Sequence, residues 1–272
     1  MKHLLTALIA CLVALAPVHA QKQKGYPADY AGNRSRFSAL IYYSEHVEEA
    51  HRQFAEQAVE FFHKLSYGEG YKKTVVKSME QYDTVEKLRQ FDVIIMLNNM
   101  PGSPAARRAF EQYMEEGGAW IGFHAAAYND KNTNWPWLNK FLGCGKFYCN
   151  NWPPQSVLVE VDARKHPVMR NIPRQFVSAP SEWYMWDPSP RLSKNVEVLL
   201  SISKKNYPLG VKDIVRWGDF PIAWTNKDYR MVYFNFGHGD ESFMSMEQNL
   251  LLVNALTWLV APTPTLPEGR TK

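Results

Sequence analysis

The 272-residue sequence lacks the motifs that mark several common enzyme classes. It contains no Gly-x-Ser-x-Gly motif, no Walker A loop, no Gly-x-Gly-x-x-Gly motif and no paired Cys-x-x-Cys motifs. No two histidines have the His-x-x-x-His spacing of a zincin. These motifs carry the nucleophile, the phosphate-binding loop or the metal ligands of their classes. The sequence therefore has no signature of a serine hydrolase, a P-loop or dinucleotide-binding protein, or a zinc protease.

A clustered basic surface is also missing. The formal net charge is only +4, and the basic residues form no run or arm. Nucleic-acid binding requires basic groups gathered on one face, so nucleic acid is not an expected partner. With 46% hydrophobic and 21% charged residues, the composition is that of an ordinary globular protein. The chain is long enough to bury one sizeable core.

The only long apolar run lies near the start of the chain. A basic segment at 1–3 precedes an apolar run at 4–15, and Val18-His19-Ala20 then fits a small-x-small cleavage site. The run is too short and wrongly flanked for a stable membrane span. This pattern predicts a signal peptide over 1–20, Gln21 as the mature N-terminus, and a periplasmic or secreted protein.

Cysteine is scarce, with three residues in the chain. Cys11 ends a stretch that resembles a lipoprotein cleavage box, but apolar sequence continues beyond it, so we favour cleavage after Ala20. Membrane attachment is expected only if Cys11 is lipidated. Cys144 and Cys149 remain after cleavage, and an oxidising compartment allows a disulfide between them. The alternative is two small, half-buried residues in a loop, because sequence alone does not set their geometry.

Apolar strands alternate with helices in the first half of the chain. Strands are expected at 36–44, 71–79, 91–99 and 119–123, and helices at 45–65 and 104–118. This alternation predicts an α/β fold with a doubly wound parallel sheet covered on both faces. Residues 128–190 are irregular, and strands at 157–161, 196–202, 220–226 and 230–237 and a helix at 245–260 follow. We expect one domain over 36–261, after a linker or N-terminal arm at 21–35 and before a tail at 262–272.

Two expected strands end at a histidine among small residues. His124 follows the strand at 119–123, and His238 lies between two glycines after the strand at 230–237. Ligands bind at the carboxyl ends of parallel strands in such sheets, and imidazole serves both proton transfer and metal ligation. We expect both histidines on one rim, together with His46 after the first strand. The alternatives are turn-stabilising side chains for His124 and His238 and a solvated helix start for His46.

Aromatic residues surround a carboxylate in "SEWYMW", which contains Glu182 and Tyr184. Such surroundings disfavour the charged carboxylate, which suits a general acid. The alternative is a glutamate that pairs with an arginine or caps a turn. Tryptophans are dense in the same region, and the indole faces of Trp183 and Trp224 are suited to stack on sugar rings. The alternative for them is packing in the core or in loops. We expect His46, His124, Glu182 and His238 to converge in one cleft.

Six segments occur in the order found in one known family: "GGAWIGFHAAA", "WPWLNKFLGCGKF", "HPVMRNIP", "SEWYMW", "FPIAW" and "FNFGHGD". Over roughly residues 36–260, the chain resembles the ThuA-like (trehalose-utilisation) family. The resemblance implies a class I glutamine amidotransferase-like fold, which is a flavodoxin-like, three-layer α/β architecture with a doubly wound, mostly parallel sheet.

The resemblance also bears on the site. Amidotransferase relatives carry a nucleophilic cysteine at the place of His124, where the ThuA-like family has histidine. Imidazole is a poor covalent nucleophile for amide hydrolysis, so the resemblance implies that glutaminase activity is absent. Glu182, Tyr184 and His238 fall on recurrent polar positions of the family, and its association with sugar metabolism implies a saccharide substrate. The chain departs from the family at Cys144, where a glycine is usual. A histidine that is frequent shortly after the phenylalanine matched by Phe147 is also missing, which weakens the match around 147–152.

Two functions follow from these observations. The first is an exported carbohydrate-active enzyme, a hydrolase, lyase or isomerase, that acts on a di- or oligosaccharide or its keto derivative. Its catalytic residues would be His124, Glu182 and His238, working by metal-free acid/base chemistry or with a divalent metal. We favour the former, because the spacing matches no known metal motif. Its saccharide-binding residues would be His46, Tyr184, Trp183 and Trp224. The second function is a non-catalytic sugar-binding protein that uses the same cleft.

Overall fold

The structure is a computed structural model that describes residues 36–206 and 219–261. The predicted signal peptide, Cys11, the N-terminal arm at 21–35 and the tail at 262–272 lie outside the described residues. All described residues belong to one compact unit. None of the helices in these two ranges combines the length and apolar character needed to cross a lipid bilayer.

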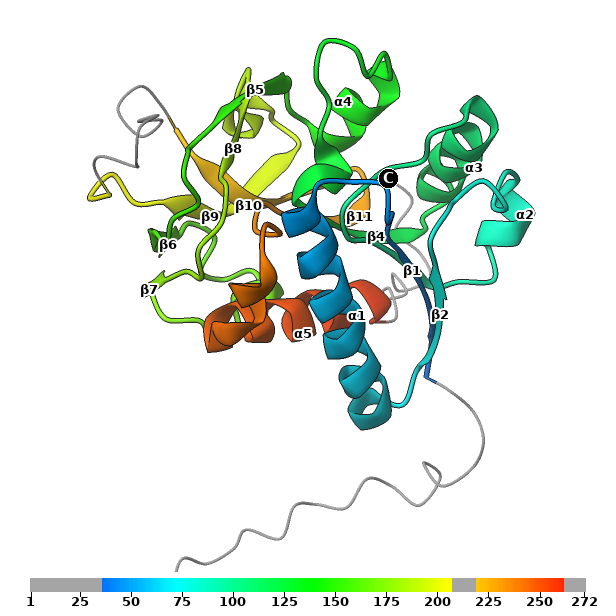
Figure 1. The fold of residues 1–272 in the computed structure, drawn as a ribbon, viewed down its shortest axis with the longest axis horizontal. Helices are drawn as coiled ribbons and strands as arrows, with labels where there is room; N and C mark the ends of the chain where they lie inside the picture. The colour runs from blue at the N-terminus through cyan, green and yellow to red at the C-terminus, as the bar shows by residue number, and fades with distance from the viewer. Residues whose placement is uncertain (1–35, 207–218, 262–272) are drawn as a thin grey trace, which may run out of the picture. The chain divides into compact units, whose positions relative to one another are not determined.

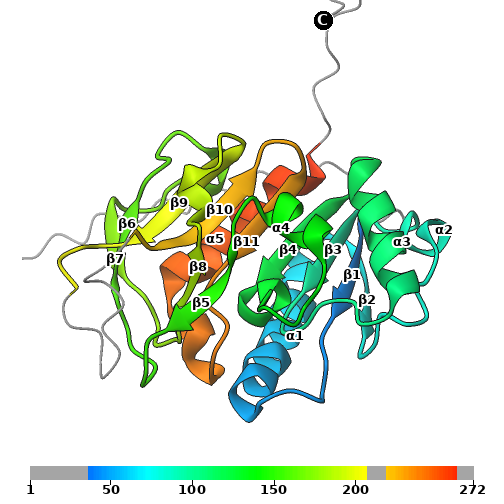
Figure 2. The same ribbon diagram turned by 90° about the horizontal axis from the view of Figure 1, so that it is seen from above.

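A nine-stranded sheet with the order β2-β1-β3-β4-β11-β10-β9-β6-β7 forms the centre of the fold. Figure 2 shows these strands in that order across the view. Five neighbouring strands run parallel: β2 (Lys72–Val76), β1 (Ser38–Tyr42), β3 (Val93–Met96), β4 (Ala119–Phe123) and β11 (Arg230–Phe234). The other four pair antiparallel: β10 (Pro221–Asn226), β9 (Val196–Ile202), β6 (Leu158–Val161) and β7 (Gln175–Val177). The predicted doubly wound α/β sheet is thus confirmed, with an antiparallel extension on one side.

Helices cover both faces of this sheet (Figure 1). One face packs against α1 (Glu49–Glu69) and α5 (Met246–Val260). The opposite face packs against α2 (Val85–Leu88), α3 (Pro104–Glu115) and α4 (Pro136–Leu142). A separate two-stranded sheet is formed by β5 (Lys146–Asn150) and β8 (Tyr184–Asp187). The described part of the chain is therefore a three-layer α/β domain with a small additional sheet.

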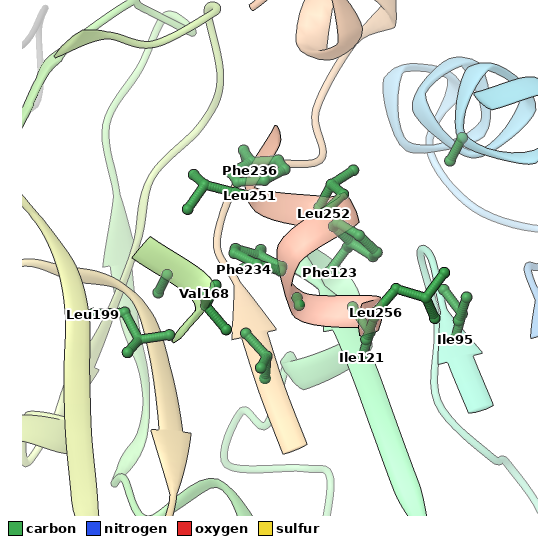
Figure 3. Close-up of a cluster of buried hydrophobic side chains, with 14 of the residues drawn as sticks. Ile95, Ile121, Phe123, Val168, Leu199, Phe234, Phe236, Leu251, Leu252 and Leu256 are labelled. Atoms are coloured by element: carbon green, nitrogen blue, oxygen red, sulfur yellow. The ribbon is translucent and has the colours of Figure 1, made fainter. Parts of the chain in front are cut away.

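Alternating side chains of the central strands fill the two cores. Ile121 and Phe123 of β4 point to the same side as α5, whereas Trp120 belongs to the core beneath α3. Figure 3 shows Leu251, Leu252 and Leu256 of α5 over these residues and over Phe234 of β11. All five residues of β4 are buried, which is expected of a parallel strand covered on both faces.

The irregular segment at 128–190 contains more structure than its sequence predicts. It includes α4, β5, β6, β7 and β8, of which only β6 was expected as a strand. It also contains both remaining cysteines. Cys144 and Cys149 are not joined by a disulfide, and the Cys149 Sγ lies 3.5 Å from the Met185 Sδ.

Candidate functional site

The carboxyl ends of the parallel strands lie along one edge of the sheet, as expected for strands that run in the same direction. His124 directly follows β4, and His238 follows β11, its hydrogen-bonded neighbour. Asn98 lies just beyond β3 and is buried. Its side chain accepts a hydrogen bond from the Ser44 backbone N–H and donates to the carbonyl oxygens of Ser44 and His51. Asn98 therefore attaches the first turn of α1 to the end of β1.

A cavity of about 580 Å³ opens at this edge. Its lining combines hydrogen-bonding side chains with aromatic ones. The polar lining residues are Glu48, His51, Asn98, Asn99, Arg107, Thr133, Asn150 and Glu182, and the aromatic ones are Tyr128, Phe147 and Tyr184. His124 and His238 are buried next to these residues, in ring contact with His51.

His124 is held in one orientation and one tautomer. Its side chain is fully buried, and its backbone adopts a left-handed φ of 40°. The Nδ1 atom lies 2.9 Å from the Asn235 carbonyl oxygen. Because a carbonyl oxygen only accepts, Nδ1 carries the hydrogen and Nε2 presents a lone pair. The ring stacks on Tyr184 with 3.8 Å between centroids, which fixes its plane.

His51, His124 and His238 form a cluster of imidazoles. The ring centroid of His51 lies 4.9 Å from that of His124 and 5.1 Å from that of His238. The ring centroids of His124 and His238 are 5.9 Å apart. Burial is the main cause that lowers the pKa of each imidazole: to about 4 for His51, well below the usual value for His124, and below it for His238. All three are therefore neutral near pH 7.

Two carboxylates face this cluster. The His238 Nε2 lies 3.5 Å from the Glu48 Oε1 and 3.8 Å from the Glu182 Oε2, which is too long for good hydrogen bonds. Glu182 is buried and accepts a 2.9 Å hydrogen bond from the Asn150 side chain, whereas Glu48 is exposed. Glu182 is thus the carboxylate whose position is set by the protein.

Glu182 reaches the imidazoles because the β8 segment is fastened to the end of β11. The buried Asn235 side chain accepts a 3.1 Å hydrogen bond from the Tyr184 backbone N–H and donates a 2.8 Å bond to the Tyr184 carbonyl oxygen. The same residue offers its own carbonyl oxygen to His124. Asn235 therefore positions both the carboxylate and one imidazole.

Four of the predicted site residues come together. His124, Glu182, His238 and Tyr184 all lie at or directly beneath the cavity. His46 does not join them. It is exposed and not part of the lining, because α1 begins at Glu49 and not at residue 45, so 45–48 form a loop in which the His46 N–H donates to the Ser44 side chain.

The prediction that Trp183 and Trp224 bind the saccharide is contradicted. Both side chains are fully buried, with 0% exposure. Their indole N–H groups donate to the carbonyl oxygens of Gln155 and Leu142, respectively. Each indole packs in a different core, so neither presents a face to the cavity. The aromatic residues that line the cavity are Tyr128, Phe147 and Tyr184.

His51, Glu48, Asn150 and Asn235 were not anticipated from the sequence. One signal was available for His51. It lies on the same helical stripe as Phe54, Ala55, Ala58 and Phe62, all of which face the core. A histidine within a core-facing stripe requires a polar partner.

The arrangement is suited to proton transfer and to cation binding. Neutral imidazoles and a carboxylate can each accept a proton. Donor atoms of Glu48, His51 and His238 lie within 4.8 Å of one another, as do those of His51, His124 and Glu182. His51 is common to both groups.

Comparison with solved structures identifies similar proteins. A ThuA-like protein from Bacteroides uniformis ATCC 8492 is 62% identical, with 88% of this chain and 97% of that chain covered and a TM-score of 0.83. A ThuA-like protein from Parabacteroides merdae ATCC 43184 is 15% identical over 85% of this chain and 93% of that chain, with a TM-score of 0.57. A glutamine amidotransferase from Thermotoga maritima is 10% identical over 84% and 100%, with a TM-score of 0.51. The last two similarities concern the fold alone.

A search of curated proteins finds no match. The family model described as "ThuA: Trehalose utilisation" matches residues 38–259. This range contains the whole imidazole cluster and Glu182. The chain therefore belongs to the ThuA-like family, which supports a carbohydrate-related role, and it has the glutamine amidotransferase-like fold.

Proposed function

We propose that this protein is a carbohydrate-active enzyme that binds a di- or oligosaccharide, or its keto derivative, in the 580 Å³ cavity and transfers protons through Glu182. The observation that carries the proposal is the buried Glu182 carboxylate next to three neutral imidazoles at the floor of a polar and aromatic cavity. The family's association with trehalose utilisation supports a sugar as the substrate.

The lining of the cavity favours a polyhydroxylated ligand. Its volume lies in the range of small-molecule sites, about 300–1,000 Å³. Asn99 and Arg107 offer hydrogen-bond donors for hydroxyl groups, while Tyr128 and Phe147 offer ring faces. These two aromatic residues replace the two buried tryptophans as the proposed stacking surface.

The proton chemistry follows from the charge states. Glu182 is the candidate base, since it is fixed by Asn150 and lies at the cavity wall. Burial raises the pKa of Tyr184, so its phenol keeps its proton and can donate a hydrogen bond to a sugar oxygen. Removal of a proton next to a keto group, or from a hydroxyl group, is a step within reach of this pair.

Glutaminase chemistry is not part of the proposal. The residue at the end of β4 is His124, and its imidazole hydrogen is engaged by Asn235. A buried imidazole with this geometry is not placed as an acyl-accepting nucleophile.

A panel of disaccharides and their keto derivatives, incubated with the protein with and without chelator, tests the proposal. Glu182→Gln keeps the shape and the acceptor for Asn150 but cannot serve as a base, so turnover should fall about 100- to 10,000-fold. Glu60→Gln, on the exposed side of α1, is the matched control and should retain full activity. Sugar binding by calorimetry with no turnover by wild-type protein would replace the enzyme by a sugar-binding protein.

We also propose export, on the strength of the basic, apolar and small-x-small segments in residues 1–20. Mass spectrometry of the native protein should find a chain that begins at Gln21. A lipid attached to Cys11 would refute this proposal and place the protein on a membrane.

A further inference from the structure

Three imidazole nitrogens require a common partner. The Nε2 atoms of His51, His124 and His238 are buried and have no hydrogen-bond partner among the described residues. More than 90% of buried polar groups in proteins are paired. The three atoms belong to rings that contact one another, so one ligand can satisfy all of them.

The hydrogen bond behind His124 favours a cation as that ligand. His124 donates its Nδ1–H to the Asn235 carbonyl oxygen, which leaves the Nε2 lone pair directed into the cluster. A backbone carbonyl on the far nitrogen is the usual support of a metal-bound histidine. An anion would face the lone pair of His124, whereas a metal ion accepts it.

The spacing of the rings is close to that of imidazoles around a single ion. With metal–nitrogen bonds of about 2.0–2.1 Å, a tetrahedral ion places the ring centroids of its imidazole ligands about 5 Å apart. His51 lies at this distance from both other rings, with centroids 4.9 and 5.1 Å apart, whereas the His124 and His238 centroids are 5.9 Å apart. The donor atoms within 4.8 Å of one another form two sets that share His51, one with Glu48 and His238 and one with His124 and Glu182. A shared ion therefore requires His124 and His238 to approach each other, by about 1 Å between centroids, and the two carboxylates favour a divalent cation.

We propose that His51, His124 and His238 bind one first-row divalent ion through Nε2, with Glu182 beside its open coordination position. Three protein ligands and one open position are the pattern of a catalytic metal site. Nitrogen donors select Zn²⁺, Fe²⁺, Co²⁺ or Ni²⁺ over Mg²⁺ and Ca²⁺, which prefer oxygen. The position assigned to Glu182 rests on the proposed function, whereas ion binding by the imidazoles does not.

Calorimetry on chelator-treated, dialysed full-length protein tests the inference. Zn²⁺ should bind with one ion per chain, and Mg²⁺ should not bind. Co²⁺ should produce the visible absorption of a tetrahedral nitrogen-ligated ion. His51→Gln and His238→Gln should each weaken Zn²⁺ affinity by about 100-fold or more, since even loss of a supporting residue costs about 10- to 100-fold. The exposed His46→Gln is the matched control and should bind as the wild type does.

The metal site can be refuted by either of two results. If wild-type protein binds no Zn²⁺, or if His51→Gln binds it as tightly as His46→Gln, the metal site is refuted. Circular dichroism identifies a variant that fails to fold, and the Co²⁺ spectrum of wild-type protein then remains as an independent measurement. Sugar turnover that persists without any bound ion keeps the proposed function and refutes the use of the ion in catalysis, while calorimetry alone decides whether the imidazoles bind it. One bound ion with no turnover of any sugar supports the metal site and refutes the proposed function.

Discussion

Replacing Asn235 by leucine should destabilise the domain and displace Glu182. The Asn235 side chain makes two buried hydrogen bonds, of 3.1 and 2.8 Å, with the backbone N–H and carbonyl oxygen of Tyr184. Leucine has a similar volume but neither donor nor acceptor. Leaving a buried polar group without its partner costs about 1–3 kcal/mol, so two such groups correspond to a loss of about 2–6 kcal/mol in the free energy of unfolding.

Urea denaturation followed by tryptophan fluorescence measures this loss. Asn132→Leu, at an exposed loop position, is the control and should stay within about 0.5 kcal/mol of wild type. Asn235→Asp should also destabilise the domain, because it keeps the acceptor for the Tyr184 N–H but loses the donor and introduces a buried charge. A free energy of unfolding for Asn235→Leu that equals the control's would refute the argument that this amide fastens β8 to β11.

Three further predictions concern the histidines. The pKa of His51 is 6.5 in the unfolded chain and about 4 when folded, so the unfolded state binds the proton first as pH falls. At about 1.36 kcal/mol per pKa unit, about 3 kcal/mol of stability should be lost between pH 6.5 and 4 in chelated protein. Urea midpoints at several pH values should show this fall, and His51→Gln should flatten it. Gly237→Ala should lower stability by about 1–3 kcal/mol, because its Cβ would lie 2.6 Å from the His124 Cβ and its φ is 152°; an unchanged melting temperature would contradict the clash. Ammonia release from glutamine should be absent, and release that is abolished by His124→Ala would reverse this expectation.

The strands and their shared edge could be predicted because their signals are local. The strands at 119–123 and 196–202 have the predicted bounds, since each is a mostly apolar run with clear ends. The position of His124 and His238 on one edge follows from parallel pairing alone. Glu182 could be included only through its aromatic surroundings, because nothing local in the sequence brings 128–190 to the sheet edge.

The remaining site residues depend on tertiary contacts that no local pattern encodes. His51 becomes part of the cluster because Asn98, 47 residues away, donates a side-chain hydrogen bond to the His51 carbonyl oxygen in the first turn of α1. Trp183 and Trp224 looked like sugar-stacking residues by composition, yet the nine-stranded sheet leaves two cores large enough to enclose them. His46 was placed on the rim because it follows the first strand, but its side chain is exposed in the loop at 45–48 that precedes α1.

The pairing of β4 with β11 has a consequence for how such proteins diversify. Phe123 and Phe234 are register partners, so the backbones that deliver His124 and His238 are held at the fixed separation of adjacent strands. Most aromatic and amide groups that would contact a substrate come instead from the segments beyond β4, within 128–190. Insertions or exchanges in those segments can change which molecule is accepted while the spacing of the two imidazoles stays constant. A library randomised only at Tyr128 and Phe147 would therefore explore selectivity while Asn150 keeps its hydrogen bond to Glu182.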